Sequence, residues 1–166
     1  MSCVRYLSDK IKNILKYDIS IINLRILMQN INYEDVKNYV KYNKESYQRI
    51  PLANDSKRSI YLLCWSPKQH SLVHDHPDSG CIFKVLKGNL HEITYQNENI
   101  ETISLSVNDY AYRYGNKVLH KVVNSDDYAV TLHVYPTGYT PNYYSDFGTD
   151  CGIVSTYQDE DYFANT

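Results

Sequence analysis

The sequence lacks the features that mark several large classes of protein. It has no apolar run of membrane length, and its first ten residues carry charge early without the apolar segment of a secretory leader. It has four cysteines and no CxxC pair, which argues against a disulfide framework and favours reduced thiols. These absences predict a soluble protein of the cytoplasmic type with no membrane partner.

Strong net charge is also absent. The chain has 17 Lys and Arg against 19 Asp and Glu, a formal net charge of −2, and its basic residues are scattered. Together with 43% apolar residues, this predicts neither disorder nor a nucleic-acid partner. The 166 residues suffice for one domain with a hydrophobic core, and a monomer is the default expectation.

The first third of the chain is predicted to be helical. Apolar residues recur at helical spacing from Leu7 to Leu15. A second helix is expected to begin at Asn32, with Asp35 three residues on in a capping arrangement. The stretch Ile19–Met28 fits a buried helix or a strand, and we assign it as a helix.

From about Arg58 the pattern changes to short β-type runs separated by turn residues. The expected strands are Ile60–Trp65, Leu72–Asp75, Ile82–Leu86, Leu90–Tyr95, Ile103–Leu105, Tyr110–Tyr114, Leu119–Val123, Ala129–Tyr135 and Ile153–Tyr157. Many short strands without intervening helices predict a mainly β fold with a closed antiparallel barrel. We expect one domain over residues 1–166, with a helical layer at about 1–45 and the barrel at 58–166.

The most informative stretch is His74-Asp75-His76. Side chains two residues apart on a β-strand point to the same face. His74 and His76 can therefore offer two imidazoles to one metal ion while Asp75 faces away. A third histidine from a remote strand would leave coordination positions open for chemistry. His120 and His133 are the candidates.

The spacing around these histidines resembles the metal-binding ends of the two cupin motifs. In the first motif, His74-x-His76 is followed by Cys81, where cupins usually carry Glu, and then by Gly88. The resemblance implies a cupin-type fold, the double-stranded β-helix.

The second cupin motif ends in His, three residues and Asn, and His120 and Asn124 reproduce this ending. His133 has no such Asn four residues on. We therefore prefer His120 to His133 as the third metal ligand, and we expect Asn124 to serve a turn.

Cys81 stands where the first cupin motif usually carries Glu. With this cysteine the sequence resembles the cysteine dioxygenases of the eukaryotic type. The similarity runs from about Asn32 to Asp146, and the segment before it aligns poorly. It is densest over Leu63–Trp65, Val73–His76, Cys81, Lys87–Glu92, Leu119–Val122 and Thr131–Tyr135. In that family the three histidines hold Fe(2+), which implies an iron site at His74, His76 and His120. Gly80 stands where family members often carry a larger residue, which predicts a looser pocket wall.

The resemblance also implies roles for residues around the metal. Tyr47-Gln-Arg49 matches the family's Tyr-x-Arg, in which the Arg binds the substrate carboxylate, and Tyr47 would border the site. His133-Val-Tyr135 matches the family's His-x-Tyr. Tyr135 would place its hydroxyl near bound oxygen with its orientation fixed by His133. A thioether crosslink can join Tyr135 to Cys81.

The chemistry of three neutral imidazoles fits this assignment. They leave Fe(2+) its full charge, which favours an anionic thiolate ligand. Substrate and O2 can then meet on one ion, while Arg49 pairs with the carboxylate at two points. The resemblance implies conversion of L-cysteine to cysteine sulfinic acid, with both oxygen atoms on sulfur, in cysteine catabolism. The partners would be a small thiol and O2.

Three other functions remain compatible with the same residues. Arg49 suits any carboxylate, so the substrate can be a related thiol such as 3-mercaptopropionate. Three histidines also suit zinc, and a zinc hydrolase or hydratase could use Asp78 as its base. The third alternative is a cupin that only binds a metal or a small ligand.

Overall fold

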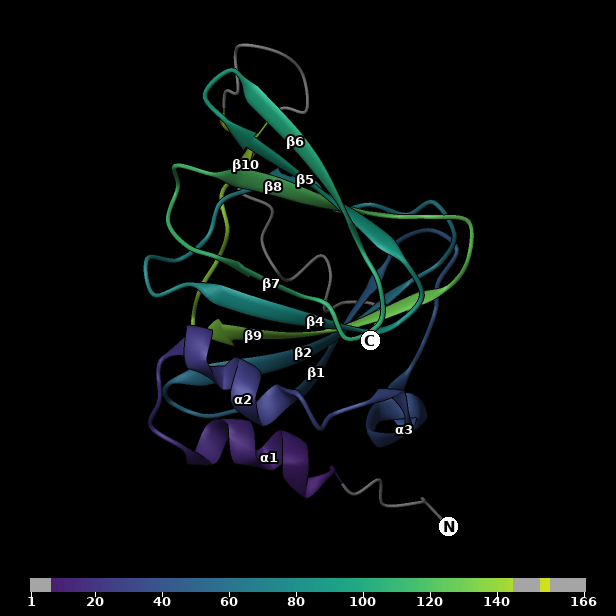
Figure 1. Ribbon diagram of the computed structural model, residues 1–166, viewed down its shortest axis with the longest axis vertical. Coiled ribbons are helices and arrows are strands. Elements are labelled where there is room, and N and C mark those ends of the chain that lie inside the picture. The colour runs from purple at the N-terminus through teal and green to yellow at the C-terminus, as the bar shows by residue number, and fades with distance from the viewer. Residues whose placement is uncertain (1–6, 145–152, 156–166) are drawn as a thin grey trace.

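The computed structural model describes residues 7–144 and 153–155, in which a helical segment is followed by strands in two antiparallel sheets (Figure 1). The helical elements are α1 (Asp9–Lys16), η1 (Ile21–Leu24), α2 (Arg25–Met28), α3 (Tyr33–Val36) and η2 (Lys37–Tyr39). Within the described residues, no helix has both the length and the apolar character needed to cross a membrane.

Local capping explains where two of these helices begin. The side chain of Ser8 accepts a hydrogen bond from the backbone of Lys10 at the start of α1. Asn32 and Asp35 form the expected reciprocal capping box at the start of α3. The helical assignment of Ile19–Met28 is confirmed over residues 21–28, where the segment is divided between η1 and α2, while residues 19 and 20 are not helical.

The strands form a five-stranded and a six-stranded sheet. The first sheet has the order β1 (Gln48–Asn54), β2 (Arg58–Trp65), β9 (Ala129–Pro136), β4 (Cys81–Lys87), β7 (Tyr110–Arg113). The second has the order β11 (Ile153–Ser155), β10 (Tyr143–Tyr144), β3 (Val73–His74), β8 (Leu119–Asn124), β5 (Leu90–Gln96), β6 (Asn99–Leu105). Non-consecutive neighbours in both sheets show that the chain crosses between them repeatedly.

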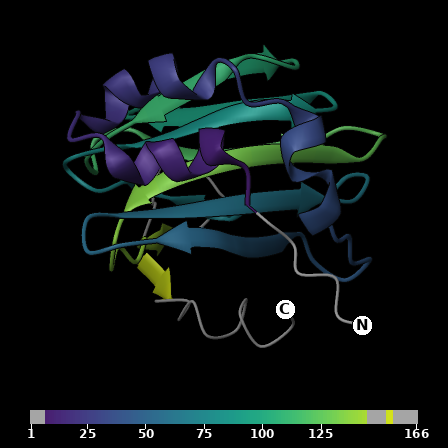
Figure 2. The ribbon, with the colours of Figure 1, turned by 90° about the horizontal axis from the view of Figure 1, so that it is seen from below.

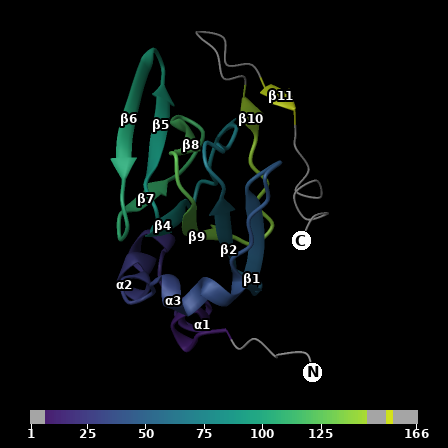
Figure 3. The same ribbon diagram turned by 90° about the vertical axis from the view of Figure 1, so that its right-hand side faces the viewer.

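The three central strands of the five-stranded sheet, β2, β9 and β4, are buried on both faces. On β2, Ile60, Leu62 and Cys64 pack toward the helices, while Leu63 and Trp65 belong to a second apolar cluster on the opposite face. This alternation follows from the pleat of the strand. The helices lie across the outer face of this sheet, as Figure 2 shows, and Figure 3 shows them from the side, below β1, β2 and β4.

Two buried cations fasten the helical layer to the sheet. The guanidinium of Arg58 donates to the backbone carbonyls of Ile14 (2.7 Å), Tyr17 (2.8 Å) and Ile19. Lys84, on β4, donates to three carbonyls at the end of α2, including that of Met28 at 2.9 Å. Burial lowers the pKa of Lys84. These bonds satisfy carbonyl groups that a helix leaves open at its C-terminal end.

The structure differs from the expected strands at two places that matter for the site. Strand β1 precedes the first expected strand and carries Arg49 within the sheet. Strand β3 is only Val73–His74, so His76 lies beyond its end. The last expected strand corresponds to β11, and residues 156 and 157 lie outside the described residues.

Candidate metal centre and pocket

Three histidines converge between the two sheets. His74 on β3 pairs directly with His120 on β8, and His76 follows β3. One nitrogen from each ring lies within 4.8 Å of the others, and the Nε2 atoms of His74 and His120 are 2.9 Å apart. The ring of His76 lies 4.3 Å from that of His120 between centroids. The fold therefore brings together the three histidines that the spacing singled out.

Burial keeps these imidazoles neutral. It lowers the pKa of His74 and His76, and lowers that of His120 well below the ordinary value for histidine. A neutral ring retains one nitrogen lone pair, which is the form that binds a metal ion.

His76 provides the observation that most favours a metal. Both of its ring nitrogens are buried and have no hydrogen-bond partner among the described residues. A buried polar atom without a partner is costly in a folded protein. A metal ion held by His74, His76 and His120 would satisfy one of these two nitrogens, so the donor set fits a divalent cation with nitrogen ligands.

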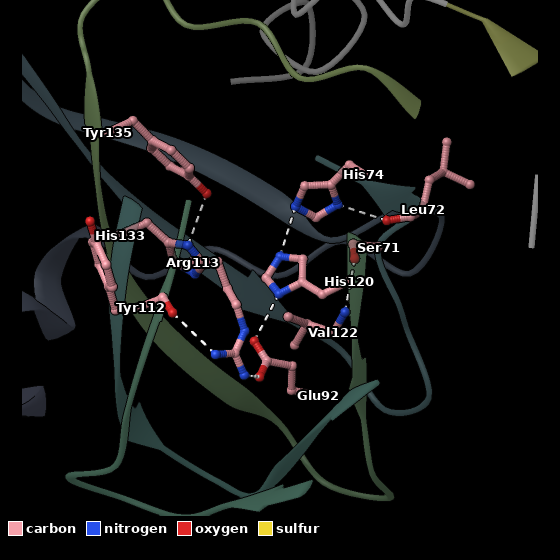
Figure 4. A network of polar contacts seen from close by, with 10 residues as sticks. All are labelled: Ser71, Leu72, His74, Glu92, Tyr112, Arg113, His120, Val122, His133 and Tyr135. Atoms are coloured by element: carbon pink, nitrogen blue, oxygen red, sulfur yellow. Dashed lines mark hydrogen bonds and ion pairs between the residues drawn. The ribbon is translucent and has the colours of Figure 1, made fainter. Parts of the chain in front are cut away.

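The other two histidines are oriented by hydrogen bonds at Nδ1. His74 Nδ1 lies 2.8 Å from the carbonyl oxygen of Leu72, and His120 Nδ1 lies 2.8 Å from Oε2 of Glu92. The other carboxylate oxygen of Glu92 pairs with the guanidinium of Arg113 (Figure 4). Sequence reasoning assigned no role to Glu92 or Arg113, although an acidic residue on an expected interior position of β5 was a usable signal.

A pocket opens onto the three-histidine cluster. Its lining includes His74, His120, His133 and the expected substrate-binding pair Tyr47 and Arg49. These side chains come from strands of both sheets, so the pocket belongs to the interior of the barrel.

Aromatic rings hold Arg49 in the pocket wall. Its guanidinium carbon lies 4.7 Å from the ring centre of Tyr61 and 5.5 Å from that of Tyr135. Tyr47 stacks on Trp65 with ring centres 4.4 Å apart. Arg49 thus presents a nearly buried positive charge to the cavity that contains the histidines.

A chain of hydrogen bonds leads to the hydroxyl of Tyr135. Trp65 donates to Thr131 Oγ1 (3.0 Å), which lies 2.7 Å from His133 Nε2. His133 Nδ1 lies 2.9 Å from the Tyr135 hydroxyl. Both nitrogens of His133 are therefore engaged, and this competing candidate does not join the three-histidine cluster. Thr131 was not singled out from the sequence.

Cys81 lies in the same pocket, on β4 beside β9. Ile82 of β4 pairs with Val134 of β9. Continued by one residue, this register sets Cys81 opposite Tyr135, and both side chains line the pocket. Burial raises the pKa of the Cys81 thiol to about 12, so the thiol is protonated at neutral pH.

The space beside Gly80 is occupied by the ring of Tyr112. A Cβ at this position would lie 2.4 Å from the ring and hydroxyl of Tyr112, and the residue has φ +89°. The side chain of Tyr112 therefore fills the space that a larger residue would need. Neither Gly80 nor Tyr112 lines the pocket that holds the histidines, so a looser pocket wall at this position stays a prediction.

Asp75 anchors the segment that covers one side of the pocket. Its carboxylate accepts hydrogen bonds from the Tyr139 hydroxyl (3.1 Å), from the backbone and side chain of Asn142 (2.9 and 2.8 Å) and from the Tyr144 hydroxyl (3.3 Å). Tyr139 and Tyr143 line the pocket from this segment. The carboxylate of Asp75 is directed to this segment and does not belong to the histidine cluster, although β3 ends at His74 and strand alternation does not extend to His76.

Two residues considered from the sequence lie elsewhere. Asp78 is exposed and lines a separate surface hollow beside Gly115, so it is not placed as a base next to the histidines. Asn124 is buried, and its amide donates to the carbonyls of Ser66 (2.9 Å) and Asp127 (2.7 Å). Asn124 therefore joins two loops at the end of the barrel.

The architecture defines the class of the protein. A Klebsiella pneumoniae protein with a double-stranded β-helix domain superposes with a TM-score of 0.53 at 20% identity, covering 62% of this chain and 87% of its own. The Thermus thermophilus protein TT1209 gives a TM-score of 0.52 at 24% identity, covering 64% and 98%. The fold is a double-stranded β-helix, mainly β with two antiparallel sheets, as expected.

The family described as cysteine dioxygenase type I matches residues 6–146, and the chain belongs to this family. The match begins well before Asn32, so it includes the helical layer, where the motifs gave no resemblance. Cysteine dioxygenase type 1 of Rattus norvegicus and that of Mus musculus are each 34% identical over 108 residues, covering 58% of this chain and 54% of theirs. The chain thus spans about half the length of these curated relatives.

Proposed function

We propose that this protein is a thiol dioxygenase that holds Fe(2+) through His74, His76 and His120. Its substrate would be L-cysteine, and its product cysteine sulfinic acid. The observation that carries the proposal is the position of Arg49 in a pocket that opens onto three neutral histidines. Membership of the cysteine dioxygenase family supports it.

The reaction joins both atoms of O2 to the substrate sulfur, so that one thiol and one O2 give one sulfinic acid. When bound, ferrous iron supplies the open coordination positions and the redox chemistry that this oxygenation requires. The protein's own residues then have to bind the substrate, orient it and exclude water.

Arg49 binds and orients the substrate in this proposal. Its guanidinium can form two parallel hydrogen bonds with a carboxylate, which fixes the direction of the thiol relative to the histidines. The rings of Tyr61 and Tyr135 restrict its movement. Positioning of this kind removes orientational freedom before the chemical step.

Tyr135 supplies a hydroxyl beside the reacting atoms. His133 lies 2.9 Å from this hydroxyl and is itself held by Thr131, so the oxygen of Tyr135 has a fixed place in the pocket. The hydroxyl can donate a hydrogen bond to oxygen bearing negative charge as the product forms. Phe83 and Val122 in the pocket lining exclude water.

The test is oxygen uptake by the Fe(2+)-loaded protein with L-cysteine and, separately, with 3-mercaptopropionate. We expect uptake with L-cysteine, formation of cysteine sulfinic acid by mass spectrometry, and no activity in His120→Ala. His70→Ala is the matched control, because His70 is exposed and outside the cluster.

The result also separates the alternatives. Faster turnover of 3-mercaptopropionate would reassign the substrate, because Arg49 alone recognises either carboxylate. Absence of uptake with both thiols would reject the dioxygenase proposal and leave a cupin that binds a metal or a small ligand. The position of Asp78 gives the zinc hydrolase alternative no support.

A further inference from the structure

Glu92 is the most deeply buried acidic side chain near the cluster, with no exposed surface. Glu92 lies on β5 opposite Val122 of β8. His120 is also on β8, two residues before Val122 and on the same face of the strand. This diagonal arrangement brings Oε2 of Glu92 to 2.8 Å from His120 Nδ1. A carboxylate in this position acts on a metal ligand from outside the pocket.

The contact determines which nitrogen of His120 carries the hydrogen. An ionised carboxylate can only accept hydrogen bonds, so His120 Nδ1 must donate. A neutral imidazole carries one N–H, and Nε2 is therefore left with its lone pair. Nε2 is the atom that lies 2.9 Å from Nε2 of His74 in the cluster.

Arg113 in turn determines how the side chain at position 92 is oriented. Its Nη2 pairs with Oε1 of Glu92, and its Nη1 donates to the carbonyl of Tyr112 at 3.1 Å. Because a guanidinium can only donate, the atom facing Arg113 must be an acceptor. Arg113 lies on β7 of the other sheet, so this pairing also connects the two sheets beside the histidines.

The three histidines are not supported equally. His74 is oriented by the nearby carbonyl of Leu72, and His76 has no hydrogen-bond partner among the described residues. Within the described residues, His120 is the member of the cluster whose ring is hydrogen-bonded to a carboxylate. Carboxylate partners of this kind fix the ring and increase its basicity as a ligand.

We propose that Glu92 and Arg113 are a pair of positioning residues that set the tautomer of His120 and so make its Nε2 available to a metal ion. Neither residue is in contact with substrate in this role. The inference deepens the proposed function and rests on it only for the link to oxygenation. The tautomer and the binding of metal can both be measured without turnover.

Glu92→Gln tests the proposal with almost no change of shape. Arg113 would draw the amide oxygen toward itself, which turns the amide NH2 toward His120. Nδ1 would then have to accept, and the hydrogen would move to Nε2, where it blocks metal binding. We expect Co(2+) affinity, measured by visible absorption and calorimetry, to fall about 10- to 100-fold.

A second change should reverse this loss. In Glu92→Gln/Arg113→Met the amide is free to turn its oxygen toward His120, and the lone pair returns to Nε2. We expect this double variant to bind Co(2+) within about threefold of Arg113→Met alone, because both then leave Nδ1 donating. A residue with a merely structural role would show no such rescue. Glu101→Gln, on the exposed face of β6, is the matched control and should bind as wild type.

Long-range 1H–15N correlation spectra of the metal-free protein report the tautomer of His120 directly, in wild type as well as in the variants. The proposal requires the Nδ1–H form of His120 in wild type, the Nε2–H form in Glu92→Gln and the Nδ1–H form again in the double variant. An Nε2–H form in wild type would overturn it, even if Glu92→Gln failed to fold. Unchanged Co(2+) affinity in folded Glu92→Gln would do the same. Correct tautomers and metal binding without oxygen uptake would reject the proposed function alone.

Discussion

Arg49 shows how much specificity a single side chain can carry. Its planar fork is matched to a carboxylate, whereas Lys offers one mobile charge. We expect Arg49→Lys to raise the KM for L-cysteine about 10- to 100-fold, corresponding to the loss of one charge-assisted hydrogen bond. Steady-state oxygen uptake measures this change.

Arg25→Lys is the matched control for this experiment. Arg25 lies 4.9 Å from the ring centre of Tyr110, a similar cation–aromatic contact outside the pocket. Its substitution should leave KM unchanged. An unchanged KM in Arg49→Lys would show that the carboxylate is bound elsewhere.

Cys81 and Tyr135 lend themselves to a test of the thioether crosslink. We expect protein that has turned over with Fe(2+), O2 and L-cysteine to contain a fraction lighter by two hydrogens, because an S–C bond replaces S–H and C–H with O2 as oxidant. Intact-mass measurement detects this species. Cys64→Ala should retain the deficit, whereas a deficit that persisted in Cys81→Ala would place the oxidation at another residue.

The buried thiol of Cys64 should make the free energy of unfolding fall at alkaline pH. Burial raises its pKa to about 11 from the ordinary value of 9.0. Between these values the folded state keeps a proton that the unfolded state loses, so the free energy of unfolding falls as pH rises. The contribution of Cys64 would make the free energy of unfolding about 1 kcal/mol lower at pH 10 than at pH 8.

Urea unfolding of wild type and Cys64→Ala at pH 8 and pH 10 measures this contribution. The variant should be less stable at pH 8 because of the cavity, but its decrease between the two pH values should be smaller. Equal decreases in both proteins would assign the alkaline slope to other groups.

The three histidines could be found from the sequence, but the pairing of their supporting residues with each other and with His120 could not. Spacing within His74–His76 and the Asn after His120 are local signals. Glu92 and Arg113 are separated by 21 residues and lie on strands of different sheets, so only the register of β5, β7 and β8 brings them together. Register of this kind depends on the whole barrel rather than on local pattern.

At the scale of single elements, Arg58 links β2 to the end of α1. Its guanidinium satisfies the carbonyls of Ile14, Tyr17 and Ile19. We expect Arg58→Met to lower the free energy of unfolding by about 3 kcal/mol, because buried carbonyls would lose their donor. Chemical denaturation measures the difference.

Lys57→Met is the control for this variant. Lys57 is the neighbouring residue, and its ion pair with Asp18 at 3.2 Å joins two largely exposed side chains. Such a pair contributes little, so stability should stay within error of wild type. Similar losses in both variants would mean that Arg58 does not act through the carbonyls.

The elements also show where sequence patterns gave incomplete answers. Strand β1 was missed because Pro51 stands in its middle, and a proline within a run argues against a strand unless the strand lies at the edge of a sheet, as β1 does. Strand β3 is shorter than expected, because its ladder pairing covers only Val73 and His74, which lie opposite Tyr144 and Tyr143 of β10. The strands that carry continuous apolar runs, β2, β4 and β9, were located correctly because both of their faces are buried.

At the scale of the whole molecule, a bound metal should stabilise the fold. The cluster joins β3 and β8, and His76 gains a partner that the described part of the protein does not offer it. At about 100 times the dissociation constant, binding to the folded state contributes about 2.7 kcal/mol. For a chain of this size we expect a rise in Tm of about 5–10 °C, measured by calorimetry with and without Co(2+).

Two variants separate the site from non-specific binding. His76→Ala should abolish the rise in Tm, while His70→Ala should retain it. The rise should also reverse on addition of a chelator. A shift that survived His76→Ala would place the stabilising ion elsewhere.

The tripeptide His74-Asp75-His76 carries two tasks on opposite faces of one short stretch. The histidines face the cluster, and Asp75 fastens the segment that holds Tyr139 and Asn142. If only these three residues were grafted into another scaffold, the histidines would be present without the segment that covers one side of the pocket. Residues 139–144 would have to be grafted together with them. Mutant libraries that vary this site should therefore change residues 74–76 and residues 139–144 together.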